Sequence, residues 1–419
     1  MESDAISQIK QLLGAAGDLR EKLSNADRLQ LIGLTDALSN ELQRPDEAVF
    51  RITFNQPGHY LAIRLAIQWG VFEALGDIGE PGKTSTQLAE SAGADQRLVV
   101  SSQLKSTPHY RDKTALTKHK ARFLRHLAAN GTIREIDLDT YTSTRLSASF
   151  RQKSFKDAIH FMFDDFYNVG WKVPSFLDSI SHRNPADINN GPFQHAHNMP
   201  GKSLYTYFGE NSAMGRRFGG MIQMYNAGKP FFWEDGWYPI KERLIEGGPT
   251  SDEDVLLIDI GGGDAGDLGI LRKALGPEVR GRLILQELKH IVDKADQDGY
   301  EAQIGDWNQP QPVKGARAYM LQHILHDYSS DDECRRILKN IIHAMRPGYS
   351  KLLIKELLIP DQNAPWALTS LDVNVMQSLS GQERTESQFR NLLESVGFKI
   401  EGTWRHENAI DVVIEASLA

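Results

Sequence analysis

From residue 254 onward the chain alternates short apolar runs with amphipathic stretches, and this pattern most constrains the fold. The run VLLIDI (255–260) is typical of a buried strand. Three further strands are expected at GRLILQ (281–286), ARAYMLQHI (316–324) and KLLIKEL (351–357). Two more, at 397–400 and 409–416, close the chain. Helical stretches such as 331–345 separate them. Strand–helix alternation of this kind predicts an α/β fold with a doubly wound parallel sheet.

Residues 1–150 are predicted to form a helical and winged-helix domain. Leucines and isoleucines recur at helical spacing in the first fifty residues, and helices are expected at 61–75, 84–93 and 122–129. A hairpin over 132–146 would complete the winged helix. Such a module can bind DNA, but the dense apolar face of 122–129 favours a role in dimerisation.

Residues 101–121 are a basic island, with five basic residues against one acid, 5 − 1 = +4, in a chain of net charge 47 − 55 = −8. Without them the flanking segments would join into one helical unit. The segment is therefore interpreted as an exposed insertion, such as a translated intron, with an ordinary long loop as the alternative. Residues 151–250 are predicted to be a helical linker and substrate-pocket segment, and 251–419 a cofactor-binding catalytic domain.

Composition excludes several classes of protein. The mild acidity without a Lys/Arg run argues against a nucleic-acid binder. The single cysteine, Cys334, excludes an intramolecular disulfide and a multi-cysteine metal site, and no metal is expected. No apolar run approaches the roughly 20 residues of a membrane span, and the N-terminus lacks the pattern of a signal peptide. The sequence thus predicts a cytoplasmic protein that binds neither nucleic acid nor membrane.

A glycine-rich turn follows the first predicted strand of this domain. Gly261, Gly263 and Gly266 satisfy GxGxxG, which permits a nicotinamide or flavin cofactor or a purely structural turn. Asp259 precedes the glycines, and Glu287 ends the next strand, where it could accept two ribose hydroxyls. An acid before the turn would repel a pyrophosphate, so the pattern favours the cationic, phosphate-free S-adenosylmethionine.

Two further positions fit the same cofactor. Asp306 and Trp307 follow the next segment, where a carboxylate and an aromatic ring could hold an adenine.

The second half resembles the class I, S-adenosylmethionine-dependent O-methyltransferases of the plant caffeate and fungal natural-product type. The matching runs are LIDIGGGDAG, GRLILQEL, IGDW, YMLQHILHDYSSDDECRRILKNIIHAMRPG, KLLIKELLIPD and GQERTESQFRNLLESVGF, in order over roughly 250–415. The segment from ITFNQPGHYLAIRLAIQWGVFEAL onward is more loosely similar to the dimerisation domain of the family. The resemblance implies a Rossmann-like methyltransferase sheet, a homodimer and a small aromatic or polyketide substrate.

The same resemblance implies a catalytic base. In the family a histidine after the third strand of the catalytic domain removes a proton from the substrate hydroxyl, and His326 matches it. Its ordinary pKa of about 6.5 would suit a general base at neutral pH, although it could merely cap the following helix. Glu356 and Glu383 match the two flanking carboxylates, with a capping role before Thr385 as the alternative for Glu383. His323 is expected to point into the packing of the sheet.

Some fungal relatives of this fold bind the cofactor without consuming it and catalyse dehydration and pericyclic reactions. Lys355 bears on this alternative, because it could offer a cation to a carbonyl-bearing substrate, although a surface position is its simpler interpretation. His160 would be a further polar group of such a pocket. Gln322, by analogy with relatives a contact of the cofactor, departs from the Lys or Arg that is frequent there, which weakens that contact without removing the site. The resemblance therefore implies an O-methyltransferase for a phenolic or enolic hydroxyl of a secondary metabolite, with a pericyclase or dehydratase acting on a pyridone-type polyketide intermediate as the alternative.

Overall fold

The computed structural model describes residues 2–92, 122–263 and 266–419. The predicted insertion at 101–121 therefore lies outside the described residues, as do two residues of the glycine turn. The described chain divides into two compact units, one of residues 1–166 and 213–227 and the other of 167–212 and 228–419. Within the described ranges, no helix combines the length and hydropathy that a membrane crossing would need.

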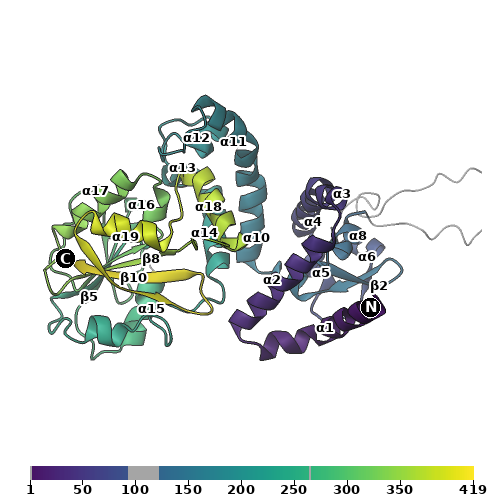
Figure 1. The fold of residues 1–419 in the computed structure, drawn as a ribbon, viewed down its shortest axis with the longest axis horizontal. Helices are drawn as coiled ribbons and strands as arrows, with labels where there is room; N and C mark the ends of the chain where they lie inside the picture. The colour runs from purple at the N-terminus through teal and green to yellow at the C-terminus, as the bar shows by residue number, and fades with distance from the viewer. Residues whose placement is uncertain (1, 93–121, 264–265) are drawn as a thin grey trace, which may run out of the picture. The chain divides into compact units, whose positions relative to one another are not determined.

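The first unit combines helices with a small sheet (Figure 1). Its elements are α1 (Glu2–Lys22), α2 (Asn25–Leu42), α3 (Pro45–Phe50), η1 (Arg51–Asn55), α4 (Gln56–Gln68), α5 (Val71–Leu75), β1 (Lys83–Thr84), α6 (Ser85–Ala92), α8 (Arg122–Ala129), β2 (Ile133–Asp137), β3 (Thr140–Ser143), α9 (Arg145–Ser149), α10 (Lys153–His160), η2 (Phe161–Phe166) and α14 (Ser212–Asn226). The strands are antiparallel in the order β1-β3-β2. The predicted helix 122–129 and the hairpin after it are confirmed.

The core of this unit lies between α4, α5, α6, α8 and the sheet, where the apolar face of each helix is buried. By contrast, α2 buries no residue, and both N-terminal helices expose apolar side chains. Leu13 is 70% exposed, Leu34 60% and Leu42 74%. In this single chain, these two helices keep an apolar surface in water.

The second unit is built on a seven-stranded sheet of order β6-β5-β4-β7-β8-β10-β9. Its strands are β4 (Val255–Ile260), β5 (Arg282–Glu287), β6 (Glu301–Ile304), β7 (Ala318–Gln322), β8 (Lys351–Leu357), β9 (Phe398–Arg405) and β10 (Asp411–Leu418). The central strands are parallel, and β10 is antiparallel to both of its neighbours. The predicted α/β fold is confirmed. β6 was not among the predicted strands, so the strand before His326 is the fourth of this sheet along the chain.

Helices cover both faces of this sheet (Figure 1). The helices of the second unit are α11 (Tyr167–Ser179), α12 (Pro192–His197), α13 (Leu204–Glu210), η3 (Lys241–Ile245), α15 (Gly266–Leu275), α16 (Lys289–Val292), η4 (Leu325–Asp327), α17 (Asp331–Ile342), α18 (Trp366–Leu379) and α19 (Glu386–Glu394). Apolar residues of α17 and α19 form one core with one face of the sheet, here called face A. Residues of α15 and of the segment before β4 form a second core with the opposite face, face B.

Strand alternation decides which polar side chains meet at the carboxyl edge of the sheet. Along β8, Ile354 packs in the core of face A and Leu353 in the core of face B. Glu356 therefore lies on face A and Lys355 on face B. The same alternation places Asp259 of β4 and Asp411 of β10 on face B.

Candidate active site

The glycine turn after β4 leaves room for a ligand beside the backbone. Gly261 and Gly263 have φ of +76° and +64°, a region that favours glycine. A Cβ at Gly261 would come within 2.6 Å of Ile324, whereas a Cβ at Gly263 would meet no described atom within 4 Å. Gly261 is thus required by packing, while Gly263 faces open space. Gly266 begins α15, whose N-terminus follows the turn.

Asp259 is a buried carboxyl directly under this turn. It is 4% exposed, and its Oδ1 has no hydrogen-bond partner among the residues of the described ranges. Burial, together with the nearby carboxylates of Asp267 and Glu287, raises its pKa to about 7, against the opposing charge of Lys355. A buried oxygen without a donor is costly, so this position suits a ligand that brings a hydrogen-bond donor or a positive charge.

Glu287 lies at the end of β5, as predicted, and its carboxylate is close to the glycine turn. The backbone N–H of Leu288 donates to Glu287 Oε2. Burial raises the pKa of Glu287, while the backbone N–H groups of Leu288 and Gly263 oppose that shift. A carboxylate in this place can accept the two vicinal hydroxyls of a ribose.

Asp306 and Trp307 line a cavity of about 290 Å³ beyond β6. Asp306 is exposed and accepts the backbone N–H of Asn308 at 2.9 Å. The Trp307 indole donates to Tyr328 Oη at 3.0 Å and packs near Gly261. The other polar groups of the lining include Gln286 and Gln311, which exchange two side-chain hydrogen bonds at 2.9 and 2.7 Å. A flat heterocycle with polar edges would find both stacking and hydrogen-bonding groups here.

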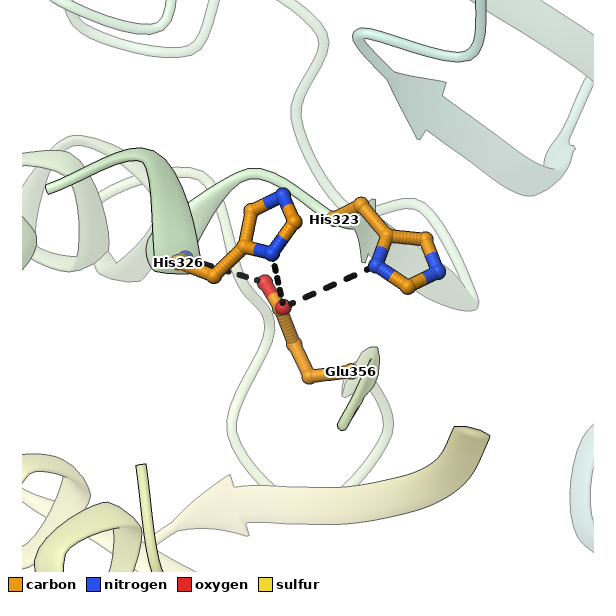
Figure 2. Close-up of side chains that lie close together, drawn as sticks. All are labelled: His323, His326 and Glu356. Atoms are coloured by element: carbon orange, nitrogen blue, oxygen red, sulfur yellow. Dashed lines mark hydrogen bonds and ion pairs between the residues drawn. The ribbon is translucent and has the colours of Figure 1, made fainter. Parts of the chain in front are cut away.

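His326 lies in η4, directly after β7, and carboxylates surround its ring. Glu383 Oε1 is 2.7 Å from Nδ1, Glu356 Oε2 is 3.7 Å from Nδ1, and Asp327 Oδ1 is 3.3 Å from Nε2. All three carboxylates are at least 95% buried. Figure 2 shows His326 together with Glu356 and with His323, whose ring centroid is 5.1 Å away.

This setting overturns the pKa expected for His326. Burial lowers the pKa of the imidazole, but the three carboxylates, Glu383 foremost, outweigh burial and raise it to about 10. The ordinary value of about 6.5 assumed from the sequence is therefore wrong for the site without ligands. A histidine among three acids holds its proton at neutral pH.

Glu356 shapes the loop that carries His326. Its Oε1 accepts the backbone N–H groups of Ile324, Leu325 and His326 at 3.0, 2.9 and 3.3 Å. Burial raises the pKa of this carboxyl, and the charge of His326 opposes the shift. One carboxylate oxygen thus closes the turn after β7, which leaves Oε2 to face the two imidazoles.

The opposite side of the same loop is held by residues that the sequence did not single out. The Arg384 guanidinium, which is 1% exposed, donates to the carbonyls of Leu325 and Tyr328 at 3.0 and 2.8 Å. Gly381 passes so close that a Cβ there would lie 2.1 Å from the His326 carbonyl oxygen. These contacts fix the backbone of His326, and the signal available in the sequence was an arginine directly after the matched Glu383.

Asp327 and Tyr205 extend this group of polar residues within the second unit. Tyr205 Oη, from α13, donates to Asp327 Oδ2 at 3.0 Å. Burial raises the pKa of Asp327 to about 7, although the charge of His326 and the Tyr205 hydroxyl oppose the shift. Glu383, predicted as a base partner with capping as the alternative, is 4% exposed and is not itself the cap, because the Thr385 side chain caps α19.

Face B carries a separate row of polar residues at the same edge of the sheet. Gln322 of β7 pairs in register with Lys355 of β8. Lys355 is only 7% exposed, so its interpretation as a surface residue is wrong; its ammonium lies 5.6 Å from the centroid of the Trp237 ring. The side chain of Asp411 is fully buried, and its Oδ2 is 3.3 Å from Lys229 Nζ.

His323 lies between the two faces. Its Nδ1 is 3.9 Å from Glu356 Oε2 and its Nε2 is 3.4 Å from Asp411 Oδ1. The residue has φ of +52°, an uncommon conformation outside glycine, and its side chain is 24% exposed. The expectation that His323 points into the packing of the sheet is therefore wrong. His160 belongs to the other unit, where its Nδ1 is 3.2 Å from Asp164 Oδ2.

Fold and site together define the class of protein: an α/β domain with a cavity of about 290 Å³, a glycine turn after its first strand and a histidine among carboxylates. A family model described as an O-methyltransferase domain matches residues 252–399. O-methyltransferase mfmE of Annulohypoxylon moriforme is 31% identical over 399 residues, covering 94% of this chain and 92% of that protein. The chain belongs to this family of O-methyltransferases, enzymes that use S-adenosylmethionine as methyl donor.

Solved structures agree with the fold at lower sequence identity. A structure described as a pericyclic reaction enzyme matches with a TM-score of 0.81 and 23% identity, covering all of both chains. OxaC in complex with SAH and oxaline matches with a TM-score of 0.78 at 23% identity, again over all of both chains. At this identity the likeness establishes the fold alone.

Proposed function

We propose that this protein transfers a methyl group from S-adenosylmethionine to a phenolic or enolic hydroxyl of an aromatic or polyketide-derived secondary metabolite. The observation that carries the proposal is His326, a largely buried imidazole at the carboxyl edge of the sheet with Glu383 Oε1 2.7 Å from its Nδ1. A carboxylate in this position orients the ring and stabilises the imidazolium that forms on proton uptake. Membership of the O-methyltransferase family supports the same chemistry.

In this proposal the neutral form of His326, a minor fraction at neutral pH because the pKa of the imidazole is raised, accepts the hydroxyl proton on Nε2. The substrate oxygen then forms the new bond to the methyl carbon with the electron pair that had held the proton. A phenol has a pKa of about 10, close to the value of about 10 for His326. The two groups would therefore share the proton almost evenly, which favours transfer within a hydrogen bond. Glu356 and Glu383 are the proposed partners of this base.

The residues around the glycine turn fit the proposed cofactor. Asp259 offers a buried, unpartnered oxygen to an ammonium group, and Glu287 offers a carboxylate to the ribose. The proposed contacts further include Gly261, Gly263, Gly266, Asp306, Trp307 and Gln322. When bound, S-adenosylmethionine supplies an electrophilic methyl group on a positively charged sulfur.

Lys355 is proposed as the cation that meets the carboxylate of the cofactor rather than a carbonyl of the substrate. It lies on face B with Asp259, opposite to Glu356. The ammonium has no ion pair with any residue in the described part of the chain, although the side chain is 93% buried. A buried cation is stable only when an anion pairs with it. The α-carboxylate of the cofactor would supply that anion, while the neighbouring α-ammonium group would donate to Asp259.

A second candidate function is a pericyclic or dehydration reaction in which the cofactor is bound but not consumed. The observation in its favour is the raised pKa of His326, because an imidazolium donates a hydrogen bond to a substrate carbonyl instead of accepting a proton. The likeness to the pericyclic reaction enzyme makes the fold compatible with this candidate.

A homodimer and a cytoplasmic location complete the proposal. The apolar side chains that α1 and α2 expose in the single chain support self-association, because water-exposed apolar surface of this extent is unfavourable in a monomer. The winged-helix character of the first unit and the division into domains at residues 150 and 250 remain parts of the same proposal.

One assay separates the two functions. The purified protein is incubated with methyl-labelled S-adenosylmethionine and a panel of phenols and enols, and product mass and S-adenosylhomocysteine are both measured. Methyl transfer predicts labelled product and one S-adenosylhomocysteine for each product. A product of unchanged mass, or one lighter by water, with no S-adenosylhomocysteine formed, would favour the second candidate. No label in any product from protein that binds the cofactor would count against the first.

A further inference from the structure

Three electron-pair donors converge on one point between the two imidazoles (Figure 2). His323 Nδ1 and His326 Nδ1 are 3.9 and 3.7 Å from Glu356 Oε2. The ligating atoms of the three residues all lie within 4.8 Å of one another. Figure 2 shows both rings turned toward the same carboxylate.

The Glu356 carboxylate is held in place through one oxygen, Oε1, while its other oxygen, Oε2, is open to a ligand. Three backbone N–H groups occupy Oε1, as described above, so the carboxylate cannot rotate without breaking the loop after β7. Oε2 is buried, and no residue of the described chain forms a hydrogen bond with it. A buried carboxylate oxygen that receives no hydrogen bond and faces two ring nitrogens is suited to bind a cation.

His323 is oriented from behind by Asp411. The Nε2 of the ring is 3.4 Å from Asp411 Oδ1, and Asp411 is itself buried beside Lys229. A carboxylate this close to Nε2 favours the proton on that nitrogen, which would leave the lone pair on Nδ1, the nitrogen that faces Glu356. This is the arrangement by which proteins orient histidines that bind metal ions.

We propose that His323, His326 and Glu356 form a binding site for a divalent transition-metal ion such as Zn²⁺. Two imidazoles and one carboxylate are a donor set that suits zinc and its neighbours in the periodic table. Ligand distances of about 2.0–2.1 Å at a tetrahedral centre need donors about 3.4 Å apart, so the separations of 3.7 and 3.9 Å must close by only a few tenths of an ångström. Glu383 Oε1, which is 2.7 Å from His326 Nδ1, could serve as the fourth ligand once the ring proton between them is lost and the two atoms move apart to about 3.4 Å.

Such an ion would inhibit methyl transfer. Coordination through His326 Nδ1 displaces the proton from that nitrogen to solvent and leaves the remaining ring proton on Nε2. The nitrogen that would accept the substrate proton is then occupied. The inhibition rests on the proposed function, whereas metal binding itself does not.

The test uses the full-length protein after treatment with EDTA and its removal. Co²⁺ is titrated as a spectroscopic probe, and Zn²⁺ is added in competition. The expected result is saturable binding of one ion with the visible bands of a low-coordinate Co²⁺ centre. His323→Gln should weaken binding at least 100-fold, and Asp411→Asn about 10- to 100-fold, since it removes only the orienting carboxylate. His343→Gln, an exposed histidine of the same unit, is the matched control and should bind like the unchanged protein.

Thermal melting and S-adenosylhomocysteine binding establish that each variant is folded, and Asp411→Asn keeps all three donors if His323→Gln does not fold. The site is refuted if the unchanged protein shows no saturable Co²⁺ binding, or if both variants bind Co²⁺ as tightly as the unchanged protein. The Co²⁺ spectrum reports metal binding whether or not the protein transfers methyl groups. The metal site and the proposed methyltransferase activity can therefore be refuted separately. Saturation with Zn²⁺ without loss of methyl transfer would overturn the inhibitory role.

Discussion

The two faces of the catalytic sheet carry opposite kinds of polar site at the same edge. On face A, Glu356 meets His326 and two further buried acids, so a cation is confined among anions. On face B, Lys355 forms no ion pair with any described residue, and its charge acts on Asp259, which lies two strands away on the same face of the sheet. Neighbouring positions of β8 thus supply the acid of one site and the cation of the other.

This difference indicates a division of labour. A histidine among acids is suited to holding and exchanging a proton. A buried lysine and a buried acid, each lacking a full complement of partners, are suited to a zwitterion. We therefore expect changes on face A to alter the rate and its pH dependence, and changes on face B to alter cofactor affinity. His323 touches both faces, through Glu356 and Asp411.

The largest expected effect is the loss of His326. His326→Gln removes the proposed proton acceptor, and general bases contribute about 10²- to 10⁴-fold, so kcat for methyl transfer should fall within that range. S-adenosylhomocysteine affinity, measured by calorimetry, should stay within about twofold, because the change lies on face A. His343→Gln serves as control. If His326→Gln instead lost affinity for S-adenosylhomocysteine and kept kcat, face A would serve cofactor binding rather than the rate, contrary to the expected division.

The next effect concerns Glu383, whose carboxylate is the foremost of the three that raise the His326 pKa to about 10. Because the base form of His326 grows as pH rises, kcat/KM should increase with pH up to about that value. Glu383→Gln removes a negative neighbour and lowers the pKa, so the midpoint of the profile should move to lower pH by about one unit or more.

The pH profile of the Glu383 variant is measured with one substrate throughout, so that the ionisation of the substrate cancels. Rates should also fall, by roughly 10- to 100-fold, since the ring loses its orienting partner. An unchanged midpoint would mean that Glu383 does not control the proton on His326.

The sequence predicted which polar residues lie at the carboxyl edge of the sheet better than it predicted their burial and their neighbours. Strand periodicity and the glycine turn located Asp259 and Glu287, because both depend on local pattern. The pKa of His326 could not be predicted, since it depends on Glu383, 57 residues away, and on burial. Alternation along β8 separated Lys355 from Glu356, but whether Lys355 faced solvent depended on Trp237, which lies outside the sheet.

A smaller effect is expected on face B. Lys355→Gln removes the proposed partner of the cofactor carboxylate, so S-adenosylhomocysteine should bind about 10-fold more weakly, the cost of one charge-assisted hydrogen bond. 5′-Methylthioadenosine lacks the carboxylate and the ammonium group and is the matched control ligand, whose affinity should not change. Equal loss for both ligands would indicate that Lys355 only supports the packing against Trp237.

The smallest net effect is expected from moving the charge by one strand. Gln322 and Lys355 are neighbours in register on parallel strands and face the same side, so a lysine at either position can reach one anion. The double variant Gln322→Lys, Lys355→Gln should therefore bind S-adenosylhomocysteine within about threefold of the unchanged protein, although Lys355→Gln alone is weakened. Recovery of affinity for S-adenosylhomocysteine, with no change for 5′-methylthioadenosine, would show that the ligand carboxylate needs a positive charge on this face and that a lysine at either position can supply it. If the double variant binds S-adenosylhomocysteine as weakly as Lys355→Gln alone, then a lysine at position 322 on β7 cannot reach the carboxylate of the ligand. That carboxylate would then be bound only from position 355 on β8.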